Sequence, residues 1–229
     1  MNCIFRSFLV LPLLAIGTAI MPAVGSADWS GDIEGGTVIR DAGNSTRLRL
    51  TLANQVRPFT QDIYVEWLRD SDGGNSYQAG YVPRYWFTDN LYGFGEGRYR
   101  VDKPLAIDRE LLLLTGVGVR FLNTAEHSLF AELGAGIRDT TFDSDLETSE
   151  ELVIARAGFF QELAEQLRFE VNANGVHGET IDEAQAEASV ALRVPGGAVR
   201  YTYRTRLIKI GDQPSLTDSD SFVSFTYGF

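Results

Sequence analysis

Apolar and polar residues alternate at every second position along most of this chain, in runs separated by short polar stretches. Between residues 129 and 137 the odd positions are all Leu, Ala or Ile, while the even positions from 132 to 138 are Glu, Gly, Gly and Arg. A period of two is that of a β-strand, whose successive side chains point to opposite faces. The pattern therefore predicts an all-β protein whose strands each have one apolar and one polar face.

Counting the alternating runs predicts twelve strands. Their lengths lie near the ~9–11 residues with which a tilted strand crosses a bilayer. An even number of strands brings both termini to the same side, as in bacterial single-chain barrels. The predicted strands span Trp29–Ile39, Thr46–Val56, Asp62–Arg69, Ser76–Trp86, Leu91–Val101, Ile107–Phe121, Ser128–Asp139, Leu152–Gln161, Leu167–His177, Glu183–Val194, Ala198–Ile210 and Ser221–Phe229.

One run, Leu91–Val101, departs from the rule. Tyr92 and Phe94 share parity with the charged residues that begin at Glu96, and the opposite positions are mostly glycine. A β-bulge inside the run would shift the parity and restore the pattern.

Two architectures have alternating strands. In a transmembrane barrel the apolar face meets lipid, whereas in a soluble periplasmic barrel or sandwich it points inward. Barrel diameter grows with strand number, and a twelve-stranded interior lined by residues such as Ala131, Ala135 and Ala186 would leave voids that a dry core does not tolerate. The sequence therefore favours a single antiparallel transmembrane β-barrel of about 12 strands with both termini periplasmic. Two stacked sheets are the remaining alternative.

The connections between the runs agree with this topology. Every second connection should be a tight periplasmic turn, and the candidates are short. The two longest connections, Asp143–Glu150 and Gly211–Asp220, fall on the outer side and are acidic. The predicted periplasmic turns are Arg57–Gln61, Phe87–Asn90, Leu122–His127, Glu162–Gln166 and Pro195–Gly197.

Aromatic residues gather near the predicted periplasmic ends of the strands, where the interfacial belt of a membrane barrel belongs. Trp67, Tyr77 and Tyr99 form a sparser set for the outer rim. The predicted periplasmic belt comprises Phe59, Tyr85, Trp86, Phe87, Phe121, Phe159, Phe160, Tyr227 and Phe229.

The first 27 residues have a different character. Arg6 precedes an apolar stretch, Phe8–Ile20, and Gly25–Ala27 forms a small-residue cleavage signal, which is typical of a secretory signal peptide. A membrane anchor is the alternative, but the stretch is shorter than the ~20 residues that a spanning helix needs. We expect residues 1–27 to be a cleaved signal peptide and residues 28–229 to form a β-barrel in the bacterial outer membrane.

Composition narrows the chemistry. The one cysteine, Cys3, lies in the predicted signal, so the mature chain has no disulfide, thiolate metal site or cysteine nucleophile. The chain carries 20 basic and 31 acidic residues, and loss of Arg6 with the signal changes the net charge from −11 to −12. Such a negative charge argues against nucleic acid as a partner.

Most arginines lie inside the alternating runs, on the polar face. A charge that faces lipid at mid-depth is strongly destabilising, so these side chains should line the lumen. Arginine outnumbers glutamate there, which makes an electropositive path for anionic solutes. Alternatively, Arg and Glu on neighbouring strands pair and close the interior, since twelve strands are near the lower limit for a water channel. The predicted lumen-lining residues are Arg47, Arg49, Glu66, Arg84, Glu96, Arg98, Arg100, Arg120, Glu132, Arg138, Arg156, Arg168, Glu170, Glu187, Arg193, Arg200, Arg204 and Arg206.

Residues that could carry catalysis are few. His127 lies in a predicted turn and His177 at a strand end, and neither has metal-ligand spacing. His127 and Ser128 are adjacent, but adjacent strand residues point to opposite faces, which disfavours the serine–histidine pair of lipid-cleaving barrels. Gly93–Gly97 superficially resembles a phosphate loop, yet nothing suggests a following helix. We therefore expect no enzyme, no cofactor and no metal site.

The acidic outer stretch around Asp143, Asp145 and Glu147 has two interpretations. It is either an ordinary solvated loop or a set of carboxylates that share divalent cations with anionic outer-leaflet lipid, because hard oxygen ligands suit Ca²⁺ or Mg²⁺. The spacing matches no EF-hand.

Three parts of the mature chain carry a family resemblance. They are Gly31 through Gly43-Asn44-Ser45, Trp86–Gly95 leading to Arg98–Asp102, and Phe121–Asn123 through His127–Leu129 to Glu132–Arg138. These segments resemble the bacterial family described as salt-induced outer membrane protein, domain of unknown function 481, over essentially the whole mature chain. The resemblance implies an outer-membrane barrel with a link to salt or envelope stress, and it implies no substrate and no catalytic residues.

The last alternating strand ends in Phe229, which looks like the tag that outer-membrane barrels present to their assembly machinery. We expect that machinery, outer-membrane lipid and lipopolysaccharide as partners. The first functional hypothesis is a narrow passive pore with an arginine-rich lumen. The second is a non-conducting barrel that supports envelope integrity, and the third, least favoured, is a lipid-modifying barrel enzyme.

Overall fold

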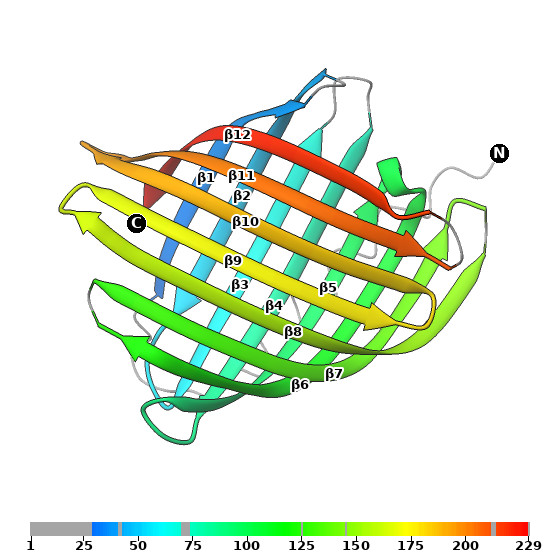
Figure 1. Cartoon of the computed structure of the whole chain (residues 1–229), viewed down its shortest axis with the longest axis horizontal. Coiled ribbons are helices and arrows are strands. Elements are labelled where there is room, and N and C mark those ends of the chain that lie inside the picture. Colours follow the sequence, from blue (N-terminus) through cyan, green and yellow to red (C-terminus); the bar gives the residue numbers. More distant parts are fainter. Residues whose placement is uncertain are drawn as a thin grey trace.

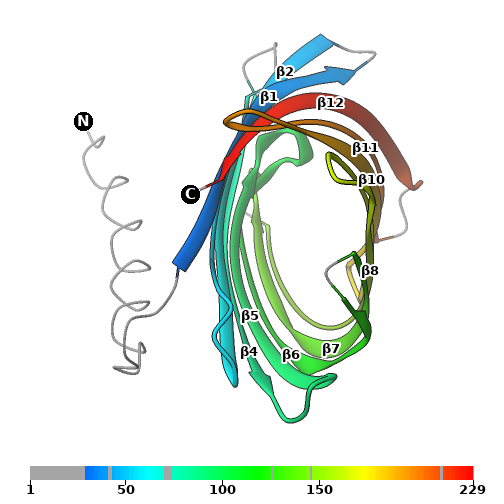
Figure 2. The same ribbon diagram turned by 90° about the vertical axis from the view of Figure 1, so that its left-hand side faces the viewer.

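The computed structural model of the protein describes residues 29–40, 43–69, 74–124, 126–144, 146–211 and 214–228. This part of the chain forms a closed antiparallel β-barrel in which consecutive strands pair and β1 pairs with β12. Figure 1 shows the tilted strands from the side, and Figure 2 shows the ring of strands flattened to an oval. The elements are β1 (Trp29–Arg40), β2 (Gly43–Asn54), β3 (Phe59–Arg69), β4 (Asn75–Trp86), β5 (Leu91–Asp102), the 3₁₀ helix η1 (Lys103–Leu105), β6 (Ile107–Asn123), β7 (His127–Phe142), β8 (Glu147–Ala164), β9 (Leu167–Gly178), β10 (Ile181–Val194), β11 (Gly197–Ile210) and β12 (Leu216–Gly228).

All twelve predicted strands are present, so the predicted single antiparallel β-barrel is confirmed. The prediction of two long acidic connections is wrong. Both connections are shorter, because β7 continues to Phe142, β8 begins at Glu147 and β12 begins at Leu216. A β-ladder satisfies backbone N–H and C=O groups whatever side chains it carries, so these hairpins pair beyond the alternating segment. Apolar alternation ends before the strands do.

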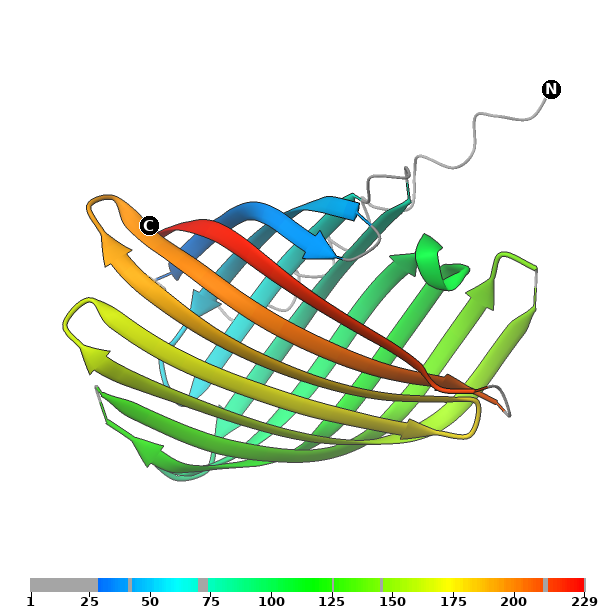
Figure 3. The ribbon, with the colours of Figure 1, turned by 45° about the horizontal axis from the view of Figure 1, so that its top comes forward.

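The described chain begins and ends at the same end of the barrel, since Asp32 near the start of β1 pairs with Gly228. We call this end the terminal rim; it carries the β2–β3, β4–β5, β6–β7, β8–β9 and β10–β11 connections. The opposite end, the distal rim, carries the other connections and η1. Figures 1 and 3 show the terminal rim at the left and the distal rim at the right.

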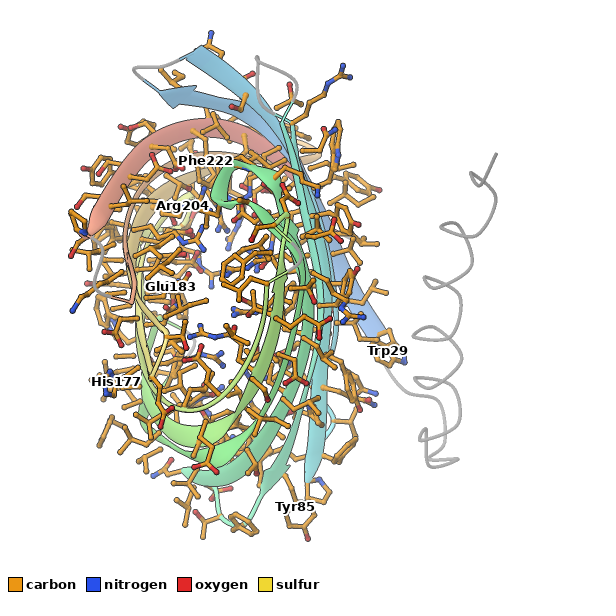
Figure 4. All side chains as sticks on the ribbon, turned by 90° about the vertical axis from the view of Figure 1, so that its right-hand side faces the viewer. Trp29, Tyr85, His177, Glu183, Arg204 and Phe222 are labelled. Atoms are coloured by element: carbon orange, nitrogen blue, oxygen red, sulfur yellow. The ribbon has the colours of Figure 1, made fainter. Side chains whose placement is uncertain are left out.

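The strand faces separate apolar from polar side chains. On β7, Leu133 is 65% exposed whereas its neighbour Glu132 is 3% exposed. Figure 4 shows the same separation, with Glu183 and Arg204 inside the ring and Tyr85 outside it. Apolar surface exposed to water is unfavourable by about 25 cal/mol per Å², so an apolar outer belt belongs in lipid. The soluble alternative, with its apolar face inward, is therefore wrong. No helix in the described part of the chain is both long and apolar enough to cross a membrane.

The irregular run on β5 contains no bulge between Leu91 and Arg100; the one register shift follows Arg100. Tyr92 and Phe94 instead face the interior, where they are 1% and 4% exposed. A Cβ added at Gly118 would overlap the Tyr92 ring, and one at Gly116 would meet the Phe94 ring. The parity is therefore regular, and glycines on β6 make room for inward aromatic rings.

The predicted periplasmic aromatic belt is partly right. Tyr85, Phe87 and Phe121 are exposed on the outer face near the terminal rim. Trp86 is buried inside, where its indole N–H donates to the Thr60 hydroxyl at 3.1 Å. Phe160 also faces inward, beneath the guanidinium of Arg168 at 4.1 Å. Adjacent strand residues alternate between faces, so nearness to the rim alone does not place a side chain in the belt.

Two sequence predictions lie outside the described residues. These are the signal peptide at residues 1–27 and the terminal residue Phe229.

Candidate functional site: the charged barrel interior

The charged residues predicted for the lumen share the inner face of the strands, and most of them lie deep in the barrel. Arg120 and Arg193 lie instead at the mouth of the terminal rim, where Arg193 is 62% exposed in its side chain and pairs with Glu162 at 3.3 Å. Many of the other predicted residues fall into clusters, some of which join strands far apart in the sequence.

The first cluster, the distal bridge, crosses the lumen near the distal rim. Glu110 on β6 pairs with Arg98 at 3.3 Å and with Arg100 at 2.7 Å. Arg100 also reaches Glu183 on β10 at 3.3 Å. Glu183 in turn accepts from Arg206 on β11 at 2.9 Å. Four strands are thus tied together, and Arg100, Glu110 and Glu183 at the centre of the cluster are buried.

The second cluster, the central bridge, lies deeper. Glu132 on β7 accepts from the Tyr92 hydroxyl at 2.8 Å and from Arg84 at 3.5 Å, and it forms an ion pair with Arg156 at 3.6 Å. Arg156 also pairs with Glu96, which links β8 to β5. A buried carboxylate is tolerated when several donors satisfy it, and Glu132 meets this condition.

A third contact holds the β9–β10 turn to the barrel wall. Arg138 on β7 is fully buried and pairs with Glu150 on β8 at 2.6 Å. It also donates to the carbonyl of Ile181, while Glu150 accepts from the backbone N–H of Thr180 at 2.6 Å. Glu150 is therefore a buried structural partner and not a residue of a solvated loop.

Among the described residues the inner face carries no excess of arginine, because acids missing from the predicted set offset it. Five of these acids lie inside predicted strands at inward parity, and the others lie just beyond the predicted strand ends. Near a membrane boundary a charged side chain costs little free energy on either face of a strand. The alternation of charged and apolar residues therefore identifies the inner face only at mid-depth. Extending the parity of each run along the full ladder would have found them. The missed acids are Asp32, Glu34, Asp62, Asp102, Glu110, Glu150, Glu162, Glu183, Asp218 and Asp220.

The interior is hollow on one side. A distal cavity of about 370 Å³ reaches η1, and a terminal cavity of about 460 Å³ reaches the β8–β9 and β10–β11 connections. Neither cavity is lined by any described residue of β6 or β7. Leu112, Leu114, Leu152 and Ile154 form a buried apolar cluster on that wall instead. We call the β6–β7 wall, with the side chains packed against it, the packed side, and the rest of the lumen wall, which lines the cavities, the open side.

The two cavities share two lining residues, Arg49 on β2 and Glu187 on β10. The Arg49 guanidinium lies 5.9 Å from the centre of the Tyr64 ring, and its Nε atom is buried without a hydrogen-bond partner. Within the described ranges neither Arg49 nor Glu187 takes part in an ion pair, although Arg49 lies opposite Glu34 and Glu66 and Glu187 lies opposite Arg204 in the ladders. The junction thus holds one cation and one anion that are not engaged in an ion pair in the described part of the chain.

Comparison with known proteins assigns the chain to a family. Residues 44–229 match the family described as "Protein of unknown function, DUF481". The chain belongs to the DUF481 family. Among its relatives, "Uncharacterized protein YdiY" of Escherichia coli (strain K12) is 26% identical over 161 residues, which cover 69% of this chain and 64% of YdiY. The match therefore spans less than two thirds of that relative's length.

Two solved structures are similar to this DUF481 protein in fold. "NanC porin structure in rhombohedral crystal form" has a TM-score of 0.59 at 8% identity and covers 86% of this chain and 98% of that one. "Outer-membrane expressed OmpT of Vibrio cholerae" has a TM-score of 0.51 at 8% identity and covers 91% of this chain and 100% of that one. At such identity the likeness shows the outer-membrane barrel fold alone.

The remaining chemical candidates of this DUF481 protein lie at the rims. His177 is exposed on the outer face and pairs with Asp182 at 2.6 Å, while His127 lies 3.8 Å from Glu126. No group of three or more potential metal ligands occurs among the residues that the structure describes. Gly93–Gly97 lies within β5 rather than in a loop before a helix.

In the acidic stretch at the distal rim, Asp143 pairs with a lysine side chain. The Lys103 amino group lies 2.6 Å from Asp143 and 2.7 Å from Asp108. These two hydrogen bonds raise the pKa of Lys103 above its usual value. Asp145 lies outside the described residues, and Glu147 begins β8.

Proposed function

We propose that this protein is an outer-membrane barrel with a narrow passage for small hydrophilic solutes. One observation carries the proposal: two charged cavities, each reaching one rim, meet at Arg49 and Glu187 on the open side of the lumen. Charged and amide side chains along such a path replace part of the water lost by a solute. The fold shared with a porin agrees with this function.

A closed barrel that supports envelope integrity is the second candidate. The distal and central bridges favour it, because they cross the lumen with ion pairs that narrow it. The two candidates differ in the open side alone. Passage requires the junction of the two cavities to admit solute, whereas a structural barrel does not.

Planar-bilayer recording of the purified protein tests the choice. We expect small, stable unitary currents. Asn172 is exposed on the inner face and lines the terminal cavity, so Asn172→Trp should reduce the current severalfold. Ala173→Trp is the matched control. The Ala173 side chain lies next to Asn172 in the sequence but points to the outer face, so this substitution should leave the current unchanged. Silent bilayers over a range of salt and voltage would contradict the passage and favour the closed barrel.

We further propose that the barrel resides in the outer membrane with the terminal rim in the periplasm. The apolar outer belt supports this location, and we propose lipid, lipopolysaccharide and the barrel assembly machinery as partners. Cysteines placed at Ser144 and Gly196 should react from opposite sides, because these positions lie at the distal and terminal rims. Labelling of both from outside intact cells would refute the orientation.

A transport role rather than an enzymatic one is part of this proposal, and it is supported by the position of His127 and His177 outside the lumen. The link to salt stress rests on the family resemblance. Growth of a deletion strain and its parent at rising NaCl concentration tests it. Loss of growth that the wild-type chain restores is the expected result, and equal growth would refute the link.

A further inference from the structure

The junction of the two cavities differs from the rest of the interior in how its charges are arranged. Nearby, Arg47 pairs with Glu66 at 2.6 Å and Arg204 pairs with Asp220 at 2.7 Å. Arg49 and Glu187 form no ion pair within the described part of the chain, although Arg49 lies opposite Glu34 and Glu66 in its two ladders and Glu187 lies opposite Arg204. Those neighbours are engaged by other partners: Glu66 by Arg47, Arg204 by Asp220, and Glu34 by the Ser224 hydroxyl. One cation and one anion therefore face the same short stretch of the path without neutralising each other.

On its β9 side Glu187 is flanked by uncharged polar side chains, while on its β11 side it lies opposite Arg204, which Asp220 engages. In the β9–β10 ladder Glu187 lies opposite Asn172, and Gln185 lies opposite Asn174. These amides line the terminal and distal cavities on either side of the junction. Amides both donate and accept hydrogen bonds, so they can solvate either end of a solute without selecting a sign of charge.

A charge of either sign meets attraction and repulsion together at such a junction. An anion is drawn to Arg49 and repelled by Glu187, and the reverse holds for a cation. A solute with one positive and one negative group can satisfy both side chains at once, provided that it turns its carboxylate to Arg49. Replacing lost water with two favourable contacts lowers the barrier for that solute alone.

We propose that Arg49 and Glu187 form the selectivity site of the passage and that it favours small dipolar solutes, which carry one cationic and one anionic group, over solutes of a single charge. This inference rests on the proposed passage. It assigns the specificity to two residues that occupy opposite parts of the sequence and meet only in the closed barrel.

The test is efflux from proteoliposomes that contain the full-length protein and one of three solutes of similar size: glycine, glycolate or ethanolamine. We expect glycine to leave about fivefold faster or more, which is the factor for one charge pair at contact distance in water. Arg49→Gln should shift the preference toward ethanolamine, and Glu187→Gln should shift it toward glycolate. The double variant should remove the preference.

Two controls keep the result interpretable. Arg49→Lys retains the positive charge and should retain the preference for glycine, which separates a role of charge from a general effect on folding. Arg109→Gln alters an exposed arginine near the distal rim, outside both cavities, and should leave all three rates unchanged.

The outcomes distinguish this inference from the proposed function. Equal efflux of the three solutes, or an unchanged order in both single variants, would overturn the selectivity site while leaving the passage in place. No efflux of any solute together with silent bilayers would overturn the passage and, with it, the selectivity site.

Discussion

The packed side and the open side of the lumen are built from the same alternating strands, yet their interiors differ. On the packed side Arg138 and Glu150 are 0% and 1% exposed in their side chains and bind each other. On the open side the Arg168 side chain is 39% exposed and lies at the edge of a cavity. The alternating pattern thus decides which face a side chain joins, and not how tightly that face is packed.

The difference has a physical cause. Removing two charges from water is expensive, so a buried pair persists only where partners satisfy it completely. The packed side meets this condition with inward rings seated over glycines, as at Tyr92 and Gly118, and with an apolar cluster around Leu112 and Ile154. On the open side the Arg168 and Arg200 side chains stay partly hydrated, and a pair that stays hydrated contributes little to stability.

The largest effect should come from breaking the packed side at Arg138. Arg138→Ala leaves Glu150 buried without its cation and removes the donor to the Ile181 carbonyl. We expect a loss of ~3–5 kcal/mol in the free energy of unfolding. Urea unfolding in lipid vesicles, followed by tryptophan fluorescence, measures it.

The matched control for Arg138→Ala is Arg193→Ala at the terminal rim. Its side chain is 62% exposed, so the expected loss is ~0–1 kcal/mol. Similar small losses in both variants would show that the buried ion pair on the packed side contributes no more to stability than an exposed pair at the rim.

A smaller effect should follow from adding one methyl group to the packed side. In Gly118→Ala the new Cβ would overlap the Tyr92 ring, so the ring must move, at an expected cost of ~1–3 kcal/mol in unfolding free energy. Gly175→Ala on β9 is the control, because a Cβ there meets nothing within 4 Å. The same unfolding assay compares them. If Gly118→Ala is as stable as the control, the position of the Tyr92 ring against Gly118 does not require a glycine.

The smallest effect on stability should come from the open side at Arg200. This side chain pairs with Glu170 at 3.1 Å and is 24% exposed, so Arg200→Ala should change the unfolding free energy by less than ~1 kcal/mol. It lines the terminal cavity, so the same variant should raise the unitary current. Val199→Ala, on the lipid face of β11, should leave the current unchanged. A large loss of stability without a gain in current would show that the open side is packed.

Particular residues show where prediction from sequence succeeds. The period of two placed Leu133 outside and Glu132 inside, and it located all twelve strands. It failed for Trp86, which the sequence put in the outer aromatic belt and the structure buries inside. Nearness to the strand end suggested the belt, whereas parity, applied strictly, would have turned Trp86 inward.

The inward acids show a second kind of failure. Glu150 and Asp220 lie in segments that the sequence interpreted as acidic loops, and the structure pairs them with Arg138 and Arg204. Nothing in the composition of those segments distinguishes a solvated acid from a buried one. The ladder extends there because backbone hydrogen bonds continue, and a pattern of apolar residues does not report on them.

The amino-acid sequence by itself determined the strands and the face of each side chain, because a strand alternates its side chains locally. It also determined that charge belongs inside and apolar surface outside. Only the tertiary structure decided which charges meet. Arg100 reaches Glu183 on β10, and Arg49 shares a junction with Glu187, because closure of the ring and the register between strands bring distant segments face to face. The division into a packed and an open side follows from those pairings, which no local pattern encodes.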